Sequence, residues 1–167
     1  MPQRALFLLV EDDEDHIILF KRAFSKSNVL NPLQVVRNGH EAICYLEGAG
    51  RYRDRSTFPL PTLVLLDLKM PGIDGFEVLS WIRQQPALKT LRVIVLTSSD
   101  EIRDVNRAYQ LGANSFLVKP MDLEDLNRLT QSINGYWVWL DKAPETSRAA
   151  EVPASSKRSG ARSQDPG

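Results

Sequence analysis

Four short apolar segments of the chain are each followed by side chains that suit chemistry at an oxygen-rich site. These side chains are Glu11, Asp12 and Asp13 after the first segment, Asp67 after the second, Thr97, Ser98 and Ser99 after the third, and Lys119 after the fourth. Carboxylate oxygens are preferred ligands of Mg²⁺, and a carboxylate beside this ion, a hydroxyl and a lysine is suited to phosphoryl transfer. Asp67 would then be the nucleophile, Thr97 would donate to the phosphoryl group, and Lys119 would pair with a phosphoryl oxygen.

Asp67 is the residue whose position most needs an explanation. It directly follows "TLVLL", a run typical of a buried strand. An unpaired carboxylate in an apolar interior costs several kcal/mol, and Asp67 has no evident role as a helix cap or turn residue. The other residues each have an ordinary alternative: Asp12 or Asp13 could cap a helix. Likewise, Thr97 could simply end a strand, and Lys119 could lie on the surface.

The elements that must position these side chains follow from five apolar runs. The runs occupy residues 5–10, 33–36, 62–67, 91–97 and 115–119. Most are continuous rather than alternating, as in strands of a parallel sheet covered on both faces. Segments with helical spacing separate them, and strict alternation predicts an α/β fold. We expect a flavodoxin-like (βα)5 three-layer sandwich with a five-stranded parallel sheet in the order 2-1-3-4-5.

Polar residues at the segment boundaries support this division of the chain. Asp74 followed by Glu77 predicts a capped helix start, and Gly48 and Gly112 are placed to end helices. Because the site of an open α/β sheet lies at the carboxyl ends of its strands, four of the five strands would deliver a reactive group to one edge.

Convergence of Glu11, Asp12 and Asp67 would require compensating positive charge. Like charges ~5 Å apart repel by roughly 3 kcal/mol per pair at an effective dielectric of ~20. Lys119 supplies one positive charge, and a hard divalent cation supplies two more. The sequence holds no Cys or His cluster that would favour zinc, so the pattern predicts a Mg²⁺ site.

These residues resemble a known family. The segments "LVEDD", "LLDLKMPGIDG", "IVLTSSD" and "FLVKP" resemble, in content and order, those of the receiver domains of two-component response regulators. The resemblance covers roughly residues 4–140 and implies that Asp67 accepts a phosphoryl group. It further implies that Asp12 and Asp67 bind Mg²⁺ directly, that Glu11 acts through water, and that the backbone carbonyl of Lys69 completes the protein ligands.

The same resemblance assigns a conformational switch. Thr97 matches the family's switch hydroxyl, Lys119 its essential lysine, and Phe116 its switch aromatic, which is often a tyrosine. Phosphorylation would draw Thr97 inward and let Phe116 follow, biasing the face of the fourth helix, fifth strand and fifth helix. The Lys119–Pro120 bond is expected to be cis, which proline tolerates. Asp13 lies one place beyond the matching acidic pair and is left as a helix cap.

A narrower resemblance concerns the partner. The long basic connection over residues 48–61 and the segment "INGYWVWL" resemble the small receivers paired with bacterial and cyanobacterial phytochrome kinases. The phosphodonor implied is the phosphohistidine of a red-light-sensing histidine kinase.

The C-terminal part of the sequence bears on assembly and output. We expect a receiver domain over residues 1–142 and a disordered tail over 143–167, with no segment that could be an output domain. The protein would then signal through protein contacts without binding DNA. A seven-residue repeat near the end of the fifth helix predicts a homodimer seam, although its residues could instead close over the chain's own core. The seam consists of Leu126, Ile133, Tyr136, Trp137, Trp139 and Leu140.

Composition narrows the class of protein. With 43% hydrophobic and 25% charged residues and a formal net charge of zero, the chain gives no reason to expect nucleic acid or an anionic membrane as partner. Cys44 is the single cysteine, which excludes an internal disulfide and indicates a reducing cytoplasm. His16 and His40 have no partners at ligand spacing and are assigned no functional role.

Two other functions remain open. A haloacid-dehalogenase-type Mg²⁺-dependent phosphatase also uses a strand-end aspartate nucleophile, but it carries a second Asp two residues on, where this chain has Lys69. A pseudo-receiver would be an interaction module that is not phosphorylated. The complete set of acids, hydroxyl and lysine argues against it.

Overall fold

A computed structural model describes residues 6–26, 33–98, 102–120 and 122–142, without the side chains of 134–142. The chain divides into two compact units, residues 1–130 and 131–167. Within the described residues, no helix is both long enough and apolar enough to cross a bilayer.

The first unit is built on a five-stranded sheet. Its strands are β1 (Phe7–Val10), β2 (Leu33–Val36), β3 (Leu63–Leu66), β4 (Arg92–Thr97) and β5 (Ser115–Val118). All neighbouring strands are parallel and their order is β2-β1-β3-β4-β5. This confirms the predicted strand order, and the strands fall inside the five apolar runs.

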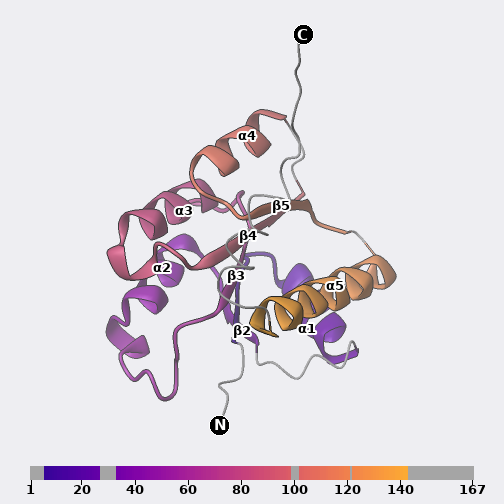
Figure 1. Cartoon of the computed structure of the whole chain (residues 1–167), viewed down its shortest axis with the longest axis horizontal. Helices are drawn as coiled ribbons and strands as arrows, with labels where there is room; N and C mark the ends of the chain where they lie inside the picture. The colour runs from indigo at the N-terminus through magenta and orange to yellow at the C-terminus, as the bar shows by residue number, and fades with distance from the viewer. Residues whose placement is uncertain (1–5, 27–32, 99–101, 121, 143–167) are drawn as a thin grey trace. The chain divides into compact units, whose positions relative to one another are not determined.

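Helices cover both faces of the sheet (Figure 1). They are α1 (Glu14–Lys26), α2 (Gly39–Glu47), α3 (Gly75–Gln84), α4 (Ile102–Gln110) and α5 (Leu123–Lys142), with short 3₁₀ turns η1 (Gly50–Tyr52) and η2 (Pro86–Leu88). Helices α2, α3 and α4 lie on one face. On the other face lie α1 and the first part of α5, whose Thr130 hydroxyl donates to the Ala23 carbonyl at 3.5 Å.

Alternate residues of each strand explain why the apolar runs are continuous. Leu8 and Val10 of β1 belong to the core cluster formed with α2 and α3. Phe7, the residue before Leu8, points the other way and meets Phe24 of α1 edge to face, with ring centroids 5.7 Å apart. Since successive strand residues face opposite sides, both sets must be apolar when helices cover both faces.

The ends of two helices are fixed as predicted. Asp74 caps α3 in a capping box, accepting from the Glu77 N–H while the Glu77 side chain accepts from the Asp74 N–H. Gly48 ends α2 with φ +73°, and its N–H bonds back to the helix carbonyls. The left-handed conformation at this position favours glycine.

The basic connection before β3 is tied to α2 rather than loose. Arg55 donates to the carbonyls of Tyr45 and Leu46 at 2.8 Å each, and to that of Phe58 at 3.0 Å. Its guanidinium thus satisfies carbonyls at the end of α2 that lack helical partners. The Tyr45, Tyr52 and Phe58 rings contact one another beneath it. One arginine and three rings therefore order this long segment.

Stability at alkaline pH tests the packing of Tyr52. Burial, followed by the hydrogen bond to Glu41, raises the pKa of Tyr52 to about 12. The folded state therefore disfavours the phenolate, so this contribution is complete below the unfolded pKa of about 10 and is lost as pH rises toward 12. When the pH rises from about 9 to about 11, the free energy of unfolding measured in urea should fall by about 1 kcal/mol more for the wild type than for Tyr52→Phe. Parallel curves for the two proteins would contradict the assignment.

The predicted dimer seam needs correction at its first residue. Leu126 is 2% exposed, so it is a core residue of this chain and is not available to a partner. A stripe that packs on a protein's own sheet has the same helical spacing as a seam between helices, which is why the sequence did not separate them. In the second unit, Ile133 is 3% exposed. The Tyr136, Trp137, Trp139 and Leu140 side chains, and residues 143–167, lie outside the described residues.

Candidate functional site

Sheet register brings the predicted site residues to one edge. Val10 of β1 pairs with Leu66 of β3, so Glu11 and Asp67 both follow the last paired position of their strands. The Asp67 N–H donates to the Val10 carbonyl at 3.1 Å. Two strands further along, the Lys119 N–H donates to the Thr97 carbonyl at 2.7 Å. Backbone hydrogen bonds beyond the strand ends therefore fix the backbone positions of Asp67 and Lys119 independently of their side-chain contacts.

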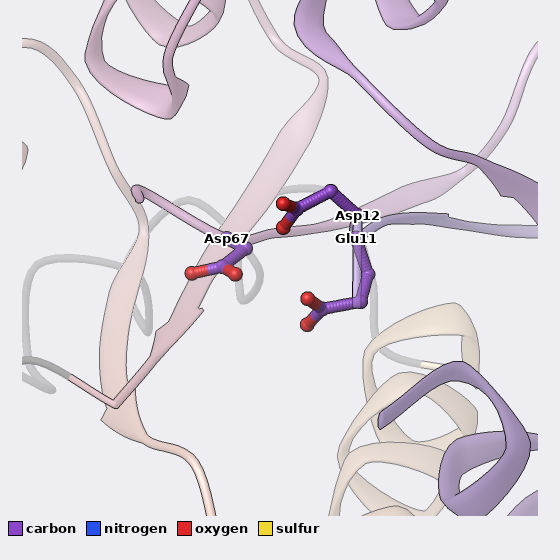
Figure 2. Close-up of side chains that lie close together, drawn as sticks. All are labelled: Glu11, Asp12 and Asp67. Carbon is purple, nitrogen blue, oxygen red and sulfur yellow. The ribbon is translucent and has the colours of Figure 1, made fainter. Parts of the chain in front are cut away.

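Three carboxylates gather at this edge (Figure 2). One oxygen from each of Glu11, Asp12 and Asp67 lies within 4.8 Å of the other two. Glu11 and Asp67 are 1% and 6% exposed, whereas Asp12 is exposed. The cluster is therefore buried on one side and open on the other, as a site that exchanges ligands requires.

Lys119 lies beneath the cluster and is almost fully buried. Its Nζ donates to Glu11 Oε1 at 2.5 Å and to Asp67 Oδ2 at 3.4 Å. Three carboxylates against this one ammonium leave excess negative charge. Buried carboxylates at such separations need further compensation, so the donor set fits a hard divalent cation.

The pKa of Glu11 reflects this environment. Burial raises the pKa of Glu11 above its ordinary value, the hydrogen bond from Lys119 opposes that rise, and the charge of Asp67 adds to it. Lys119 is thus the main group that limits the rise in the pKa of Glu11. Its Oε1 is already paired with the ammonium, so Glu11 has less capacity than the other two acids to bind a cation directly.

The loop after β3 is shaped by a glycine. A Cβ on Gly75 would lie 2.3 Å from the Asp67 carbonyl oxygen, so only glycine lets α3 start this close to Asp67. The Lys69 N–H approaches Asp67 Oδ1 at 3.4 Å, and the Lys69 ammonium pairs with Asp104 of α4 at 3.2 Å. The loop carrying the Lys69 carbonyl is therefore linked both to Asp67 and to α4.

The two residues predicted to form a switch lie on β4 and β5. Thr97 is fully buried at the end of β4. Phe116 lies opposite Val95 on β5 and is partly buried against the core. Its N–H donates to the hydroxyl of Tyr109 on α4 at 3.1 Å. A tyrosine hydroxyl is thus present beside β5, although it comes from α4 and not from residue 116.

Two further predictions have clear outcomes. Asp13 caps α1 as expected, with its Oδ1 accepting from the Asp15 N–H at 2.9 Å and from the His16 N–H at 3.4 Å. The expected cis bond between Lys119 and Pro120 is wrong, because the described part of the chain has no cis peptide. The trans form of an X–Pro bond is favoured by only about 0.5–1 kcal/mol, so sequence alone does not determine the isomer.

Sequence reasoning missed one residue of the site. His16 was assigned no role, but its Nδ1 lies 3.0 Å from Lys119 Nζ. The only signal in the sequence was its place three residues after Asp13, on the first turns of the helix that follows β1.

Comparison with known proteins agrees with this geometry. The family described as "Response regulator receiver domain" matches residues 7–131. The chain is 40% identical over 142 residues to "Probable methanogenesis regulatory protein FilR2" of Methanothrix harundinacea, covering 83% of this chain and 87% of the relative. It is 38% identical over 133 residues to "Response regulator Rcp1" of Synechocystis sp., covering 80% and 88%.

Solved structures give the same result. The Mn²⁺-bound form of Rcp1 is similar with a TM-score of 0.71 over 80% of this chain and 94% of that chain, at 38% identity. The phosphorylated cyanobacterial phytochrome response regulator RcpA is similar with a TM-score of 0.75 over 81% and 95%, at 34% identity. The chain therefore belongs to the response regulator receiver domain family, as a two-component response regulator homologous to phytochrome response regulators.

Proposed function

We propose that this chain is a single-domain response regulator that accepts a phosphoryl group on Asp67 from a sensor histidine kinase. The observation that supports this most directly is the contact of Asp67 with a buried ammonium at the open edge of the sheet. The Asp67 carboxylate lies within 4.8 Å of the Glu11 and Asp12 oxygens and 3.4 Å from Lys119 Nζ.

The transfer step follows from these positions. A carboxylate oxygen of Asp67 attacks the phosphorus of the kinase phosphohistidine, a P–O bond forms, and the P–N bond breaks. The bonding electron pair returns to the imidazole nitrogen, which takes up a proton. Lys119 donates to a phosphoryl oxygen as negative charge develops, and the Thr97 hydroxyl donates to the product phosphoryl group.

Mg²⁺ is the proposed metal. Asp12, Asp67 and the Lys69 carbonyl would hold it, with Glu11 acting through water, and all four donors are hard oxygen atoms. Bound there, the ion would neutralise negative charge on the phosphoryl oxygens. The same acidic cluster is compatible with other hard divalent cations.

The site of phosphorylation tests the proposal directly. The full chain is incubated with a phosphorylated histidine kinase and Mg²⁺, and the product is reduced with borohydride, which converts an aspartyl phosphate to homoserine. Mass spectrometry should then find homoserine at position 67. Label at another residue, or none when the same kinase phosphorylates its own receiver, would contradict the proposal. Continuous release of phosphate from a chromogenic ester would favour the phosphatase instead.

Substitutions of two neighbouring acids, Asp12 and Asp13, test the proposed metal ligands. Asp12→Asn should weaken Mg²⁺ binding about tenfold to a hundredfold, since one of the two charged ligands is lost. Asp13→Asn is the matched control: it removes the same charge one residue later and keeps a good helix cap. Titration of Mg²⁺ against tryptophan fluorescence compares the two variants. Equal weakening by both would show a general charge effect and not ligation by Asp12.

A phytochrome-type kinase is the proposed donor. Similarity to RcpA and Rcp1 supports this, although FilR2, of comparable identity, has a name that concerns methanogenesis. Phosphotransfer from a purified phytochrome kinase should be faster than from unrelated histidine kinases. Equal or slower transfer would remove the phytochrome assignment while leaving the receiver function intact.

The output is proposed to be protein contact in the cytoplasm, without DNA binding or enzymatic turnover. Phosphorylation would draw Thr97 inward and let Phe116 turn toward the core, changing the α4–β5 face. A homodimer through Tyr136, Trp137, Trp139 and Leu140 remains a proposal from sequence. Sedimentation velocity of the full chain, with and without a phosphodonor, tests it: a monomer in both states would exclude the dimer.

A further inference from the structure

His16 lies beside the buried lysine of the site, on the helix that follows the first acidic pair. We propose that His16 is a positioning residue: its Nδ1 accepts a hydrogen bond from Lys119 and directs the remaining ammonium N–H toward Asp67. The inference rests on the proposed phosphorylation of Asp67 and names a residue that acts on it through Lys119.

The direction of this hydrogen bond follows from the donor count. A lysine ammonium has three N–H donors and no acceptor. Its three neighbours are Glu11 Oε1 at 2.5 Å, His16 Nδ1 at 3.0 Å and Asp67 Oδ2 at 3.4 Å. Each N–H thus has one partner, and His16 must accept. Its ring proton is then on Nε2.

Other partners for the same ring nitrogen are too distant. His16 Nδ1 is 3.7 Å from Glu11 Oε2 and 3.8 Å from Asp13 Oδ2. Hydrogen bonds of this type fall near 2.7–3.2 Å. Only the contact with Lys119 meets that range, so the ring nitrogen is an acceptor and does not donate to either acid.

The three contacts differ in length in a way that suits the reaction. The two shorter ones hold the head of a long, flexible side chain whose single point charge sets no orientation by itself. The longest is to Asp67, the residue that receives the phosphoryl group. An incoming phosphoryl oxygen can take over that N–H while Glu11 and His16 keep the other two. A precisely held donor is worth far more in catalysis than a rotating one.

Three substitutions of His16 distinguish a role as hydrogen-bond acceptor from a role in filling space. Asparagine carries an oxygen on Cγ, at the place of Nδ1 in histidine. Glutamine carries its oxygen one bond further out, and alanine carries none. His16 has a side chain 26% exposed, so a shorter residue leaves no sealed cavity. Asparagine and histidine also have similar helix propensities.

The rate of Asp67 phosphorylation is measured with acetyl phosphate and Mg²⁺. An Asp67 oxygen attacks phosphorus, the P–O bond to the acetyl group breaks, and acetate leaves with the electron pair. His16→Ala and His16→Gln should react about tenfold more slowly than wild type, and His16→Asn should stay within about threefold. The affinity for Mg²⁺ should be unchanged in all three. In a Lys119→Met background, His16→Ala should have no further effect.

Nuclear magnetic resonance gives a readout that needs neither metal nor phosphodonor. Long-range ¹H–¹⁵N spectra of the ring should show the His16 proton on Nε2, with Nδ1 accepting. A ring protonated on Nδ1 would overturn the inference. So would a rate for His16→Ala equal to wild type, or a rate for His16→Asn as slow as His16→Ala. Failure of wild type itself to react at Asp67 would instead overturn the proposed function.

Discussion

Replacing Lys119 with methionine should slow phosphorylation of Asp67 by about a hundredfold or more. Methionine keeps most of the side chain's length and apolar volume but supplies no donor. The phosphoryl group would then lose the buried ammonium that contacts Asp67, since Lys119 is 4% exposed. Phosphorylation by acetyl phosphate measures the effect. Lys89→Met, an exposed lysine on another part of the surface, is the matched control and should react at the wild-type rate.

The same substitution should also change stability in a pH-dependent way. Without the ammonium, Glu11 and Asp67 are left buried and uncompensated, so the free energy of unfolding should fall by about 2–4 kcal/mol at neutral pH without divalent cations. The pKa of Glu11 is already raised by burial and would rise further. A carboxyl with a raised folded pKa penalises the fold above that pKa, so the deficit should shrink as pH falls and Glu11 takes up a proton.

Two observations would contradict this account of Lys119. One is a variant that reacts within threefold of wild type. The other is a stability deficit in urea unfolding that grows on acidification. Added Mg²⁺ should restore part of the lost stability, because the ion binds the folded cluster and not the unfolded chain.

Arg83→Met should cost about 3 kcal/mol of unfolding free energy, the largest effect expected outside the site. Arg83 of α3 donates to acceptors on two separate segments. Before β4 these include the Leu91 carbonyl at 2.6 Å and the Lys89 carbonyl at 3.0 Å, and before β5 they are the Gly112 carbonyl at 2.9 Å and Asn114 Oδ1 at 3.0 Å. Asn114 Oδ1 in turn accepts from the Val93 N–H at 2.7 Å. One guanidinium therefore joins α3 to the segments that begin β4 and β5.

A second arginine serves as the control, because its substitution removes the same charge without removing hydrogen bonds between separate segments. Arg128 has a side chain 68% exposed and, among the residues that the structure describes, its ion pairs are with Glu124 and Asp125 of its own helix. Arg128→Met should change the free energy of unfolding by less than about 0.5 kcal/mol. Urea unfolding of the two variants, followed by circular dichroism, makes the comparison. Similar small losses for both would show that the Arg83 contacts are replaced by water at little cost.

The sheet and the cluster could be predicted because local pattern determines them. A run such as "LVLL" must be a covered strand, and parallel strands deliver their next residues to one edge. Asp67, Glu11 and Lys119 therefore meet once the strand order is known. The capping pair Asp74 and Glu77 is equally local, since both partners lie within one turn.

The remaining features depend on contacts between distant segments. Arg55 and Arg83 each collect oxygens from several loops, and neither position carries a periodic or motif signal. His16 meets Lys119 across 103 residues of sequence, so its role appears only when β5 is placed beside α1. Leu126 was ambiguous for another reason: a helix that packs on its own sheet and one that packs on a second chain bury stripes of the same spacing.

The Tyr109 hydroxyl covers a backbone donor at the margin of the sheet. β5 is an outer strand of the sheet, and the backbone N–H groups along such a margin are templates for strand addition by another chain. Tyr109 already occupies the N–H of Phe116. A displacement of α4 that withdrew this hydroxyl would open that donor. Movement of the proposed signalling face and protection against strand addition would then depend on the same contact.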